Sequence, residues 1–208
     1  MIVSFDANIG AGKTTLLNAL EGKLDPSRFK VVLEPVDTWL NKGNDNTPSI
    51  FELFYNNPSR YAFLFQMFAL HSRFEKWENI LAENKGKIIL CERSMLTDYY
   101  IFAQMLHESK DMSDHEFAVY QKWYSVIKPR ILPLFKHLIY LRVNPELCHA
   151  RIQKRARKGE ENITFDYITR LHHKHESWLN DNAHVISYDH GDINLCMKDV
   201  IEYLECLV

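Results

Sequence analysis

Residues 2–15 read Ile2-Val-Ser-Phe-Asp-Ala-Asn-Ile-Gly-Ala-Gly-Lys-Thr-Thr15, and this stretch decides the fold. Its apolar first part predicts a buried strand, and the glycines that follow predict a tight turn into a helix. The N–H groups of such a loop and of the helix N-terminus point at one spot, where the helix dipole favours an anion. The stretch therefore predicts a cradle for the phosphates of ATP or GTP, formed by Asn8, Ile9, Gly10, Ala11, Gly12, Lys13, Thr14 and Thr15.

Two side chains of this loop have specific predicted roles. Lys13 would reach the β- and γ-phosphates, and the hydroxyl group of Thr14 would ligate Mg²⁺. The usual pattern begins with glycine, whereas this chain has Ala7, whose methyl group is tolerable if φ is negative. The alternative is a glycine-rich turn that binds nothing, and the preceding strand and the Lys-Thr-Thr sequence disfavour it.

The composition is ordinary for a globular protein, with 46% apolar and 25% charged residues among 208. We expect one domain, residues 1–208. The formal net charge of −2 provides no basic field, so nucleic acid is not an expected partner. No apolar run is long enough to span a membrane, and the four cysteines contain no C-x-x-C pair. Because the first strand begins at once, we expect no signal or transit peptide and a cytoplasmic protein.

Five short apolar runs predict strands, and amphipathic stretches of helix length separate them. Such an alternation indicates an α/β fold with a parallel sheet that helices cover on both faces. Binding sites in these sheets lie at the carboxyl ends of the strands. The predicted strands are residues 2–5, 31–33, 88–91, 138–141 and 185–188.

The second predicted strand leads to Glu34, and Pro35 ends the strand there. A carboxylate that faces a phosphate loop is placed to take a proton from an attacking hydroxyl group. A glutamate at a strand end is also common on protein surfaces, and spacing alone leaves both interpretations open.

The third predicted strand ends in Glu92-Arg93. A phosphate-loop enzyme usually carries its second acidic group here, so Glu92 is a candidate to hold Mg²⁺, directly or through water. Arg93 would bind a transferring phosphoryl group. The alternative is a structural Glu–Arg ion pair, and the cost of burying such a pair favours the site.

A run of cations follows the fourth predicted strand, on a helix predicted for residues 145–158. Arg151, Arg155 and Lys158 are spaced to share one face of that helix. Together with Arg157 they suggest a lid over residues 151–162 that closes on the triphosphate. A solvated helix face and a small RNA-binding patch are the alternatives, and the lack of interleaved aromatic residues disfavours the patch.

A long helix predicted for residues 60–83 carries Gln66 and Arg73 seven residues apart, so both can face one cavity. The amide of Gln66 offers a donor and an acceptor to the edge of a nucleobase. Trp39, Tyr55 and Phe102 could form flat apolar walls, although aromatic residues at helical spacing are usually core residues.

These motifs resemble the deoxyribonucleoside kinases, and most closely their deoxycytidine/deoxyguanosine kinase branch. The resemblance covers nearly the whole chain. It rests on Asn8-Ile-Gly-Ala-Gly-Lys-Thr-Thr15, Glu34-Pro-Val36-x-x-Trp39, Phe65-Gln66, Glu92-Arg-Ser94, Tyr100-Ile-Phe-Ala103, Arg155-Ala-Arg157 and Leu171-His-His-Lys-His-Glu-Ser-Trp-Leu179.

The resemblance implies a three-layer P-loop kinase fold, with a five-stranded parallel sheet flanked by helices and an arginine-rich lid. It implies a homodimer that transfers the γ-phosphate of ATP, with Mg²⁺, to the 5′-hydroxyl of a deoxynucleoside. Glu34 is then the base, braced by Arg93, and Glu92 and Thr14 hold the metal.

Other positions of the ATP site follow from the same resemblance. Arg155 and Arg157 are the implied lid arginines. The loop from Asp189 to Ile193 is expected to line the adenine.

The acceptor side of the site is implied in the same way. Gln66 reads the base, and Trp39 and Phe102 pack around it, with Val36 and Phe65 in the same motifs. Tyr55 and Glu160 grip the 3′-hydroxyl. The register of the lid leaves Glu161 as the alternative to Glu160.

Base preference follows from three positions where the cytidine and purine kinases carry a small residue, an arginine and an aspartate. This chain has Ala69, Arg73 and Asp98 there. An Arg–Asp pair beside Gln66 presents fixed donors and acceptors to a base that bears an amino group. We therefore expect deoxycytidine or purine deoxynucleosides to be favoured over thymidine.

Two other functions remain as alternatives. A thymidylate-type nucleoside monophosphate kinase shares the P-loop, the sheet and the lid, but Glu34 would repel an acceptor phosphate. A non-catalytic nucleotide-binding regulator would most simply lack the base, the metal carboxylate or the P-loop lysine, and this chain has all three.

Overall fold

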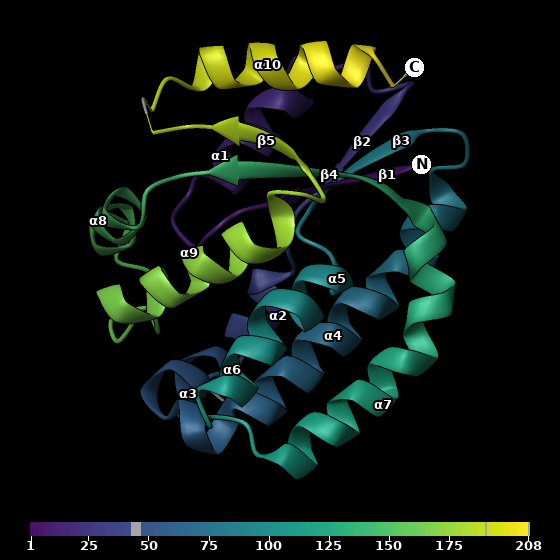
Figure 1. Ribbon diagram of the computed structural model, residues 1–208. Helices are drawn as coiled ribbons and strands as arrows, with labels where there is room; N and C mark the ends of the chain where they lie inside the picture. The colour runs from purple at the N-terminus through teal and green to yellow at the C-terminus, as the bar shows by residue number, and fades with distance from the viewer. Residues whose placement is uncertain (43–46, 190, 208) are drawn as a thin grey trace.

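The computed structural model describes residues 1–42, 47–189 and 191–207. At its centre is a parallel sheet with the strand order β2-β3-β1-β4-β5 (Figure 1). The strands are β1 (Ile2–Asp6), β2 (Phe29–Val32), β3 (Ile88–Glu92), β4 (Phe135–Arg142) and β5 (His184–Ser187). The predicted α/β fold with a five-stranded parallel sheet is therefore confirmed.

Strand β1 occupies the middle of the sheet, between β3 and β4. All five of its residues are buried, because helices cover both faces of a parallel sheet and both must be packed. The loop that follows β1 therefore leaves the sheet at the centre of its carboxyl edge. This is the position from which one loop can meet groups at the ends of several strands.

Helices form the two outer layers (Figure 1). Helices α1 (Lys13–Glu21) and α10 (Ile193–Glu205) pack together on one face of the sheet, and α4 (Pro58–Glu83), α7 (Asp114–Ile131) and α9 (Phe165–Leu179) lie on the other. None of the helices within the described residues has the length and apolar character of a membrane span. The other helical elements are α2 (Val36–Leu40), α3 (Ile50–Asn56), α5 (Met95–Thr97), the π-helix η1 (Asp98–Ala103), α6 (Gln104–Glu108), the 3₁₀ helix η2 (Leu132–Leu134) and α8 (Pro145–Arg155).

Helix α8 is shorter than the sequence predicts. It ends at Arg155, because Ala156 adopts a left-handed conformation with φ of 49°. Lys158 therefore does not share a helix face with Arg151 and Arg155, and that prediction is wrong. Its ammonium group instead forms an ion pair with Glu52 of α3, at 3.4 Å.

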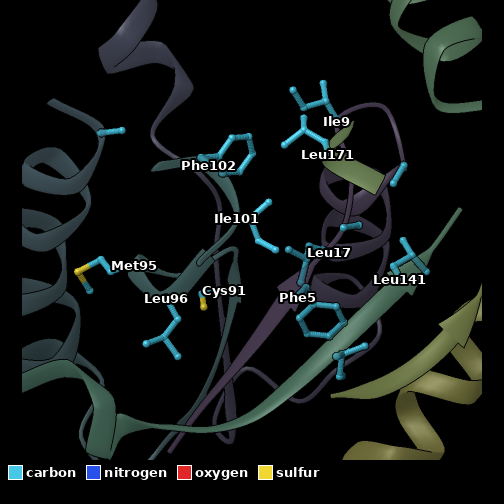
Figure 2. Packing of buried hydrophobic residues seen from close by; sticks show 14 of the residues in the cluster. Phe5, Ile9, Leu17, Cys91, Met95, Leu96, Ile101, Phe102, Leu141 and Leu171 are labelled. Carbon is cyan, nitrogen blue, oxygen red and sulfur yellow. The ribbon is translucent and has the colours of Figure 1, made fainter. Parts of the chain in front are cut away.

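Buried side chains from all three layers form one hydrophobic cluster. Figure 2 shows part of it, with Phe5 of β1, Leu17 of α1, Leu141 of β4 and Leu171 of α9. The cluster extends into the loop after β1, where Ala7 and Ala11 are fully buried. Residues on both sides of the loop glycines are thus part of the core, which fixes the loop rigidly.

We expect Gly10→Ala to show how tightly the loop packs against α8. Gly10 has φ of +78°, and a Cβ atom there would collide with the backbone carbonyl of Cys148. At Gly86, with φ of +83°, an added Cβ meets nothing within 4 Å. Gly86→Ala is thus a matched control that carries only the backbone cost, about 1–2 kcal/mol.

Urea denaturation measures both variants. The collision should lower the free energy of unfolding of Gly10→Ala by roughly a further 1–3 kcal/mol relative to Gly86→Ala. Equal losses in the two variants would show that the loop can move away from α8 at little cost.

Candidate active site

The loop from Ala7 to Gly12 closes around the side chain of Lys13, the first residue of α1. The Nζ atom of Lys13 donates hydrogen bonds to the backbone carbonyls of Ala7 and Asn8, at 3.1 and 2.9 Å. Ala7 is absent from the described non-glycine residues with positive φ, so its methyl group meets the requirement derived from the sequence. Burial and the nearby Arg93 guanidinium lower the pKa of Lys13 to about 8.

Asn8 and Arg151 attach this loop to the helices around it. The side-chain amide of Asn8 donates to the carbonyl of Ile168 in α9 at 2.9 Å, and its oxygen accepts from the Ile9 N–H. Arg151 of α8 donates to the carbonyl of Ala11 at 2.9 Å. Asn8 and Ala11 therefore fix the loop to the neighbouring helices and do not line the cavity that the loop faces.

That cavity has a volume of about 500 Å³ and brings together most of the predicted site. Leu33, Asp37, Phe51 and Tyr188 also line it, and the sequence analysis did not single them out. The predicted residues on its wall are Ile9, Gly10, Gly12, Lys13, Thr14, Thr15, Glu34, Val36, Trp39, Tyr55, Phe65, Gln66, Ala69, Arg73, Glu92, Arg93, Asp98, Phe102, Arg151, Arg155, Arg157 and Glu160.

Two guanidinium groups hold the carboxylate of Glu34. The Nη1 atom of Arg93 donates to both carboxylate oxygens, at 3.1 and 3.0 Å, and Nη2 of Arg73 donates to Oε1 at 2.8 Å. Burial raises the pKa of Glu34, but Arg93 and Arg73 lower it further, to about 2. Glu34 is therefore a buried carboxylate that stays ionised at neutral pH, and not a solvated surface residue.

Arg73 also connects Glu34 to Asp98. Its Nε and Nη2 atoms donate to the two oxygens of Asp98, at 2.9 and 3.2 Å, and its Nη1 donates to the carbonyl of Glu92 at 3.2 Å. Burial lowers the pKa of Arg73, but the carboxylates of Asp98 and Glu34 raise it above its ordinary value. The bidentate contact fixes the plane of the guanidinium at the wall of the cavity.

Arg93 has an unusual backbone conformation, with φ of 59°. Its Nη2 atom donates to the carbonyl of Ala7 at 3.2 Å, and its guanidinium lies 5.0 Å from the ring centre of Phe102. Its Nε atom is buried and has no hydrogen-bond partner within the described residues. An orphaned buried donor of this kind calls for a group that the protein itself does not supply.

Oxygen atoms that suit Mg²⁺ meet where β3 ends beside the start of α1. The hydroxyl of Thr14 donates to Oε1 of Glu92 at 2.7 Å, and the backbone N–H of Glu34 lies 3.5 Å from Oε2. A hydroxyl and a carboxylate are ligands of the hard type that this ion prefers. The described residues contain no group of three or more His, Cys, Asp or Glu that could hold a metal. A site with two protein ligands fits an ion that keeps most of its own waters.

The acceptor end of the cavity has apolar walls and one free amide. Phe65 stacks on Phe54 and meets the edge of Trp39, whose Nε1 donates to Ser72 at 2.9 Å. Gln66 is 2% exposed, and its side chain forms no hydrogen bond with the described residues. Its amide therefore has donor and acceptor capacity available to a ligand in the cavity.

The lid arginines contact a carboxylate. Arg155 donates to Glu160 at 2.8 Å, and Arg157 donates to it at 3.2 Å. Glu160 is 3% exposed and lines the cavity, whereas Glu161 is exposed and accepts from the Gly159 N–H at 2.7 Å. Of the two carboxylates left open by the sequence, Glu160 is the one beside the site.

Asp189 lies apart from the other predicted residues. It is exposed, its carboxylate accepts from the Asn144 N–H at 2.6 Å, and it does not line the cavity. Its neighbour Tyr188 does line the cavity, and Arg151 lies 5.3 Å from the ring centre of Tyr188. Within the predicted loop 189–193, residue 190 is outside the described residues.

Comparisons with known proteins agree with this geometry. A sequence model of the deoxynucleoside kinases matches residues 3–204. A probable deoxycytidine kinase of fowlpox virus (strain NVSL) is 37% identical over 180 residues, which are 86% of this chain and 72% of the viral protein. The deoxycytidine kinase of Homo sapiens is 32% identical over 231 residues, covering 97% of this chain and 87% of its own length. The mitochondrial deoxyguanosine kinase of Xenopus laevis is 30% identical over 203 residues, covering 90% and 76%.

The resemblance drawn from the sequence motifs is thus confirmed by matches that extend over nearly the whole chain. A P-loop at the centre of a parallel sheet, facing a cavity with an ionised glutamate, is consistent with phosphoryl transfer to a hydroxyl group. This chain belongs to the deoxynucleoside kinase family.

Proposed function

We propose that this protein transfers the γ-phosphate of ATP to the 5′-hydroxyl of a deoxynucleoside, giving the monophosphate for nucleotide salvage. The observation that carries the proposal is Glu34, a buried and ionised carboxylate in the same cavity as Lys13 of the P-loop. The relatives named deoxycytidine kinase and deoxyguanosine kinase support the same reaction.

Glu34 is the group that takes the proton of the 5′-hydroxyl. A carboxylate whose pKa is about 2 is a weak base. In phosphoryl transfer the transition state is loose, so positioning and charge stabilisation matter more than the strength of the base. As the 5′-oxygen bonds to phosphorus, its proton becomes strongly acidic and passes to the Glu34 oxygen.

Arg93 and Lys13 balance charge on the transferring group. When ATP binds, the ammonium group of Lys13 turns from its two backbone carbonyls to the phosphates. The Nε–H of Arg93, which has no partner within the described residues, donates to an oxygen of the transferring phosphoryl group. Arg155 and Arg157 form the lid, and their pairing with Glu160 keeps them at the rim of the cavity until ATP enters.

Thr14 and Glu92 are the residues that would hold Mg²⁺. Their oxygens meet beside Lys13, as a metal site between the P-loop and β3 requires. When bound, the ion supplies charge neutralisation to the β- and γ-phosphates of ATP.

Gln66, Arg73 and Asp98 select the base. The two hydrogen bonds between Arg73 and Asp98 hold both groups in a fixed plane. The donor and acceptor positions that they leave unused, together with the amide of Gln66, suit a base with an amino group. Ala69 leaves room beside them. Tyr55 and Glu160, both on the cavity wall, are placed to hold the 3′-hydroxyl.

An acceptor that carries a phosphate fits this cavity less well. The ionised Glu34 would repel it, and Arg73 is already paired with Asp98 and Glu34. The site therefore favours a nucleoside kinase over a nucleoside monophosphate kinase.

We also propose a homodimer that forms through α4 and α7, which pack side by side. Val119, Trp123 and Val126 follow one face of α7 and are about half exposed, and so is Leu64 of α4. Large exposed apolar groups that gather on neighbouring helices mark an association surface.

We also propose that the chain forms a single domain and works in a reducing compartment. A single domain over residues 1–208 is supported by the one hydrophobic cluster and would unfold in one cooperative transition. Four free cysteines support a reducing compartment such as the cytoplasm, which cell fractionation tests.

Replacing Glu34 by glutamine tests the base. The amide keeps the shape of the side chain but cannot accept the proton, so kcat should fall about 10²- to 10⁴-fold while ATP binding stays near wild type. Steady-state kinetics and calorimetric ATP titration measure the two effects. Glu75→Gln, which neutralises an exposed carboxylate on α4, is the control. Near-normal turnover in Glu34→Gln would exclude Glu34 as the base.

Substrate profiling tests the base preference. At fixed ATP and Mg²⁺, kcat/KM for deoxycytidine or a purine deoxynucleoside should exceed that for thymidine by about tenfold or more, since each unpaired polar group costs about 1–3 kcal/mol. A chelator should abolish turnover, and deoxycytidine monophosphate should be a poor acceptor. A kcat/KM that is highest for thymidine would overturn the preference.

Trp123→Glu tests the dimer. A buried charge at the apolar face should shift the molar mass in size-exclusion chromatography with light scattering from two chains to one. Lys122→Glu introduces the same residue at an exposed neighbouring position and should leave the mass unchanged. A wild-type chain that elutes as a monomer would contradict the proposal.

A further inference from the structure

Arg93 occupies a backbone conformation that is costly for a residue with a Cβ atom. Its φ of 59° lies in the left-handed region, which costs about 1–2 kcal/mol for residues other than glycine. Such a conformation persists only where the surrounding structure fixes it. Groups around Arg93 must therefore fix it.

The P-loop strand holds Arg93 itself. Its backbone N–H donates to the carbonyl of Phe5 at 3.0 Å, and its Nη2 donates to the carbonyl of Ala7 at 3.2 Å. These contacts fix the backbone nitrogen of Arg93 and the tip of its side chain. They leave the direction of the chain after Arg93 undetermined.

The next residues determine that direction through a reciprocal cap. Ser94 caps the short helix α5: its N–H donates to Oγ1 of Thr97 at 3.3 Å, and the Thr97 N–H donates to Oγ of Ser94 at 3.4 Å. The chain then passes directly into Asp98, the first residue of η1. The cap therefore fixes the path from Arg93 to Asp98.

One carboxylate attaches this cap to the sheet. The hydroxyl of Thr97 donates to Asp6, the last residue of β1, whose other oxygen accepts from Ser4 at 2.8 Å. Asp6, Ser94 and Thr97 are all fully buried, and none of them lines the cavity. A carboxylate that is buried this deeply is costly, and the protein compensates it with two hydroxyl donors.

We propose that Asp6 and Thr97 are positioning residues, whose hydrogen bond fixes the segment from Arg93 to Asp98 against the P-loop. The bond thereby holds Arg93 in contact with Glu34, and Asp98 in contact with Arg73. The inference rests on the function proposed above for Arg93. The placement of both residues depends on a contact that no substrate touches.

Thr97→Val is the direct test, because valine keeps the shape of threonine and removes the hydroxyl. We expect kcat to fall about ten- to hundredfold, the loss that a small misplacement of a catalytic group produces, with the KM for ATP little changed. Thr97→Ser restores the hydroxyl and should recover most of the activity. If the valine variant does not fold, Thr97→Ala and Thr97→Ser provide the same comparison.

A matched control separates positioning from stability. Ser113→Ala removes the hydroxyl of a reciprocal cap of the same type on α7. It should lower stability in urea denaturation while kcat stays near wild type. If Thr97→Val keeps wild-type kcat, or loses no more than Ser113→Ala, the inference is overturned.

A double-mutant cycle with Arg93→Lys shows whether the effect acts through Arg93. The loss of kcat caused by Thr97→Val should be smaller in the Arg93→Lys background. The lysine variant has no guanidinium group left for the Thr97 substitution to misplace. Full additivity of the two losses would overturn the inference and leave the role of Arg93 intact. If Arg93→Lys itself keeps wild-type turnover, the proposed role of Arg93 fails, and the inference fails with it.

Discussion

The site depends on one carboxylate held between two guanidinium groups. Glu34 follows β2, Arg93 follows β3 and Arg73 lies in the middle of α4, so a single ion cluster joins three elements at the edge of the sheet. Such clusters are unstable when one partner is missing, because the remaining charge is buried and unpaired. Here Arg73 directs its donors to Glu34, Asp98 and the carbonyl of Glu92, so the charges are compensated. The same cluster keeps Glu34 ionised and sets the plane that faces the acceptor.

Much of this arrangement could be predicted from the sequence, because a parallel sheet gathers the ends of its strands at one edge. Gly12-Lys13-Thr14, Glu34 and Glu92-Arg93 each lie at or just after the end of a strand, and topology places them around one cavity. Helical spacing placed Gln66 and Arg73 on the same wall. In each case local sequence sets the strand or helix that positions the residue, whereas its role is inferred from the motif or from the family resemblance.

The features that could not be predicted depend on side-chain reach or on backbone conformations without a sequence signal. Nothing near Arg73 shows that it will contact Glu34, a residue 39 positions away. Ala156 ends α8 in a left-handed conformation for which glycine is the usual signal, so Lys158 lies beyond the helix and not on its face. The turn that carries Asp98 and Phe102 is a π-helix, a form that is rare and often occurs at functional sites, and its sequence looks like that of an ordinary helix.

The position of Lys13 has a consequence for measurements of nucleotide binding. Burial lowers the pKa of this ammonium group to about 8, so part of it loses its proton in mildly alkaline solution. A polyphosphate beside it favours the charged form, so binding at pH 8 or above draws protons from the solution. The observed heat of binding there contains the ionisation enthalpy of the buffer, and it differs between buffers of different ionisation enthalpy at the same pH. The number of protons taken up, obtained from that difference, includes the contribution of Lys13.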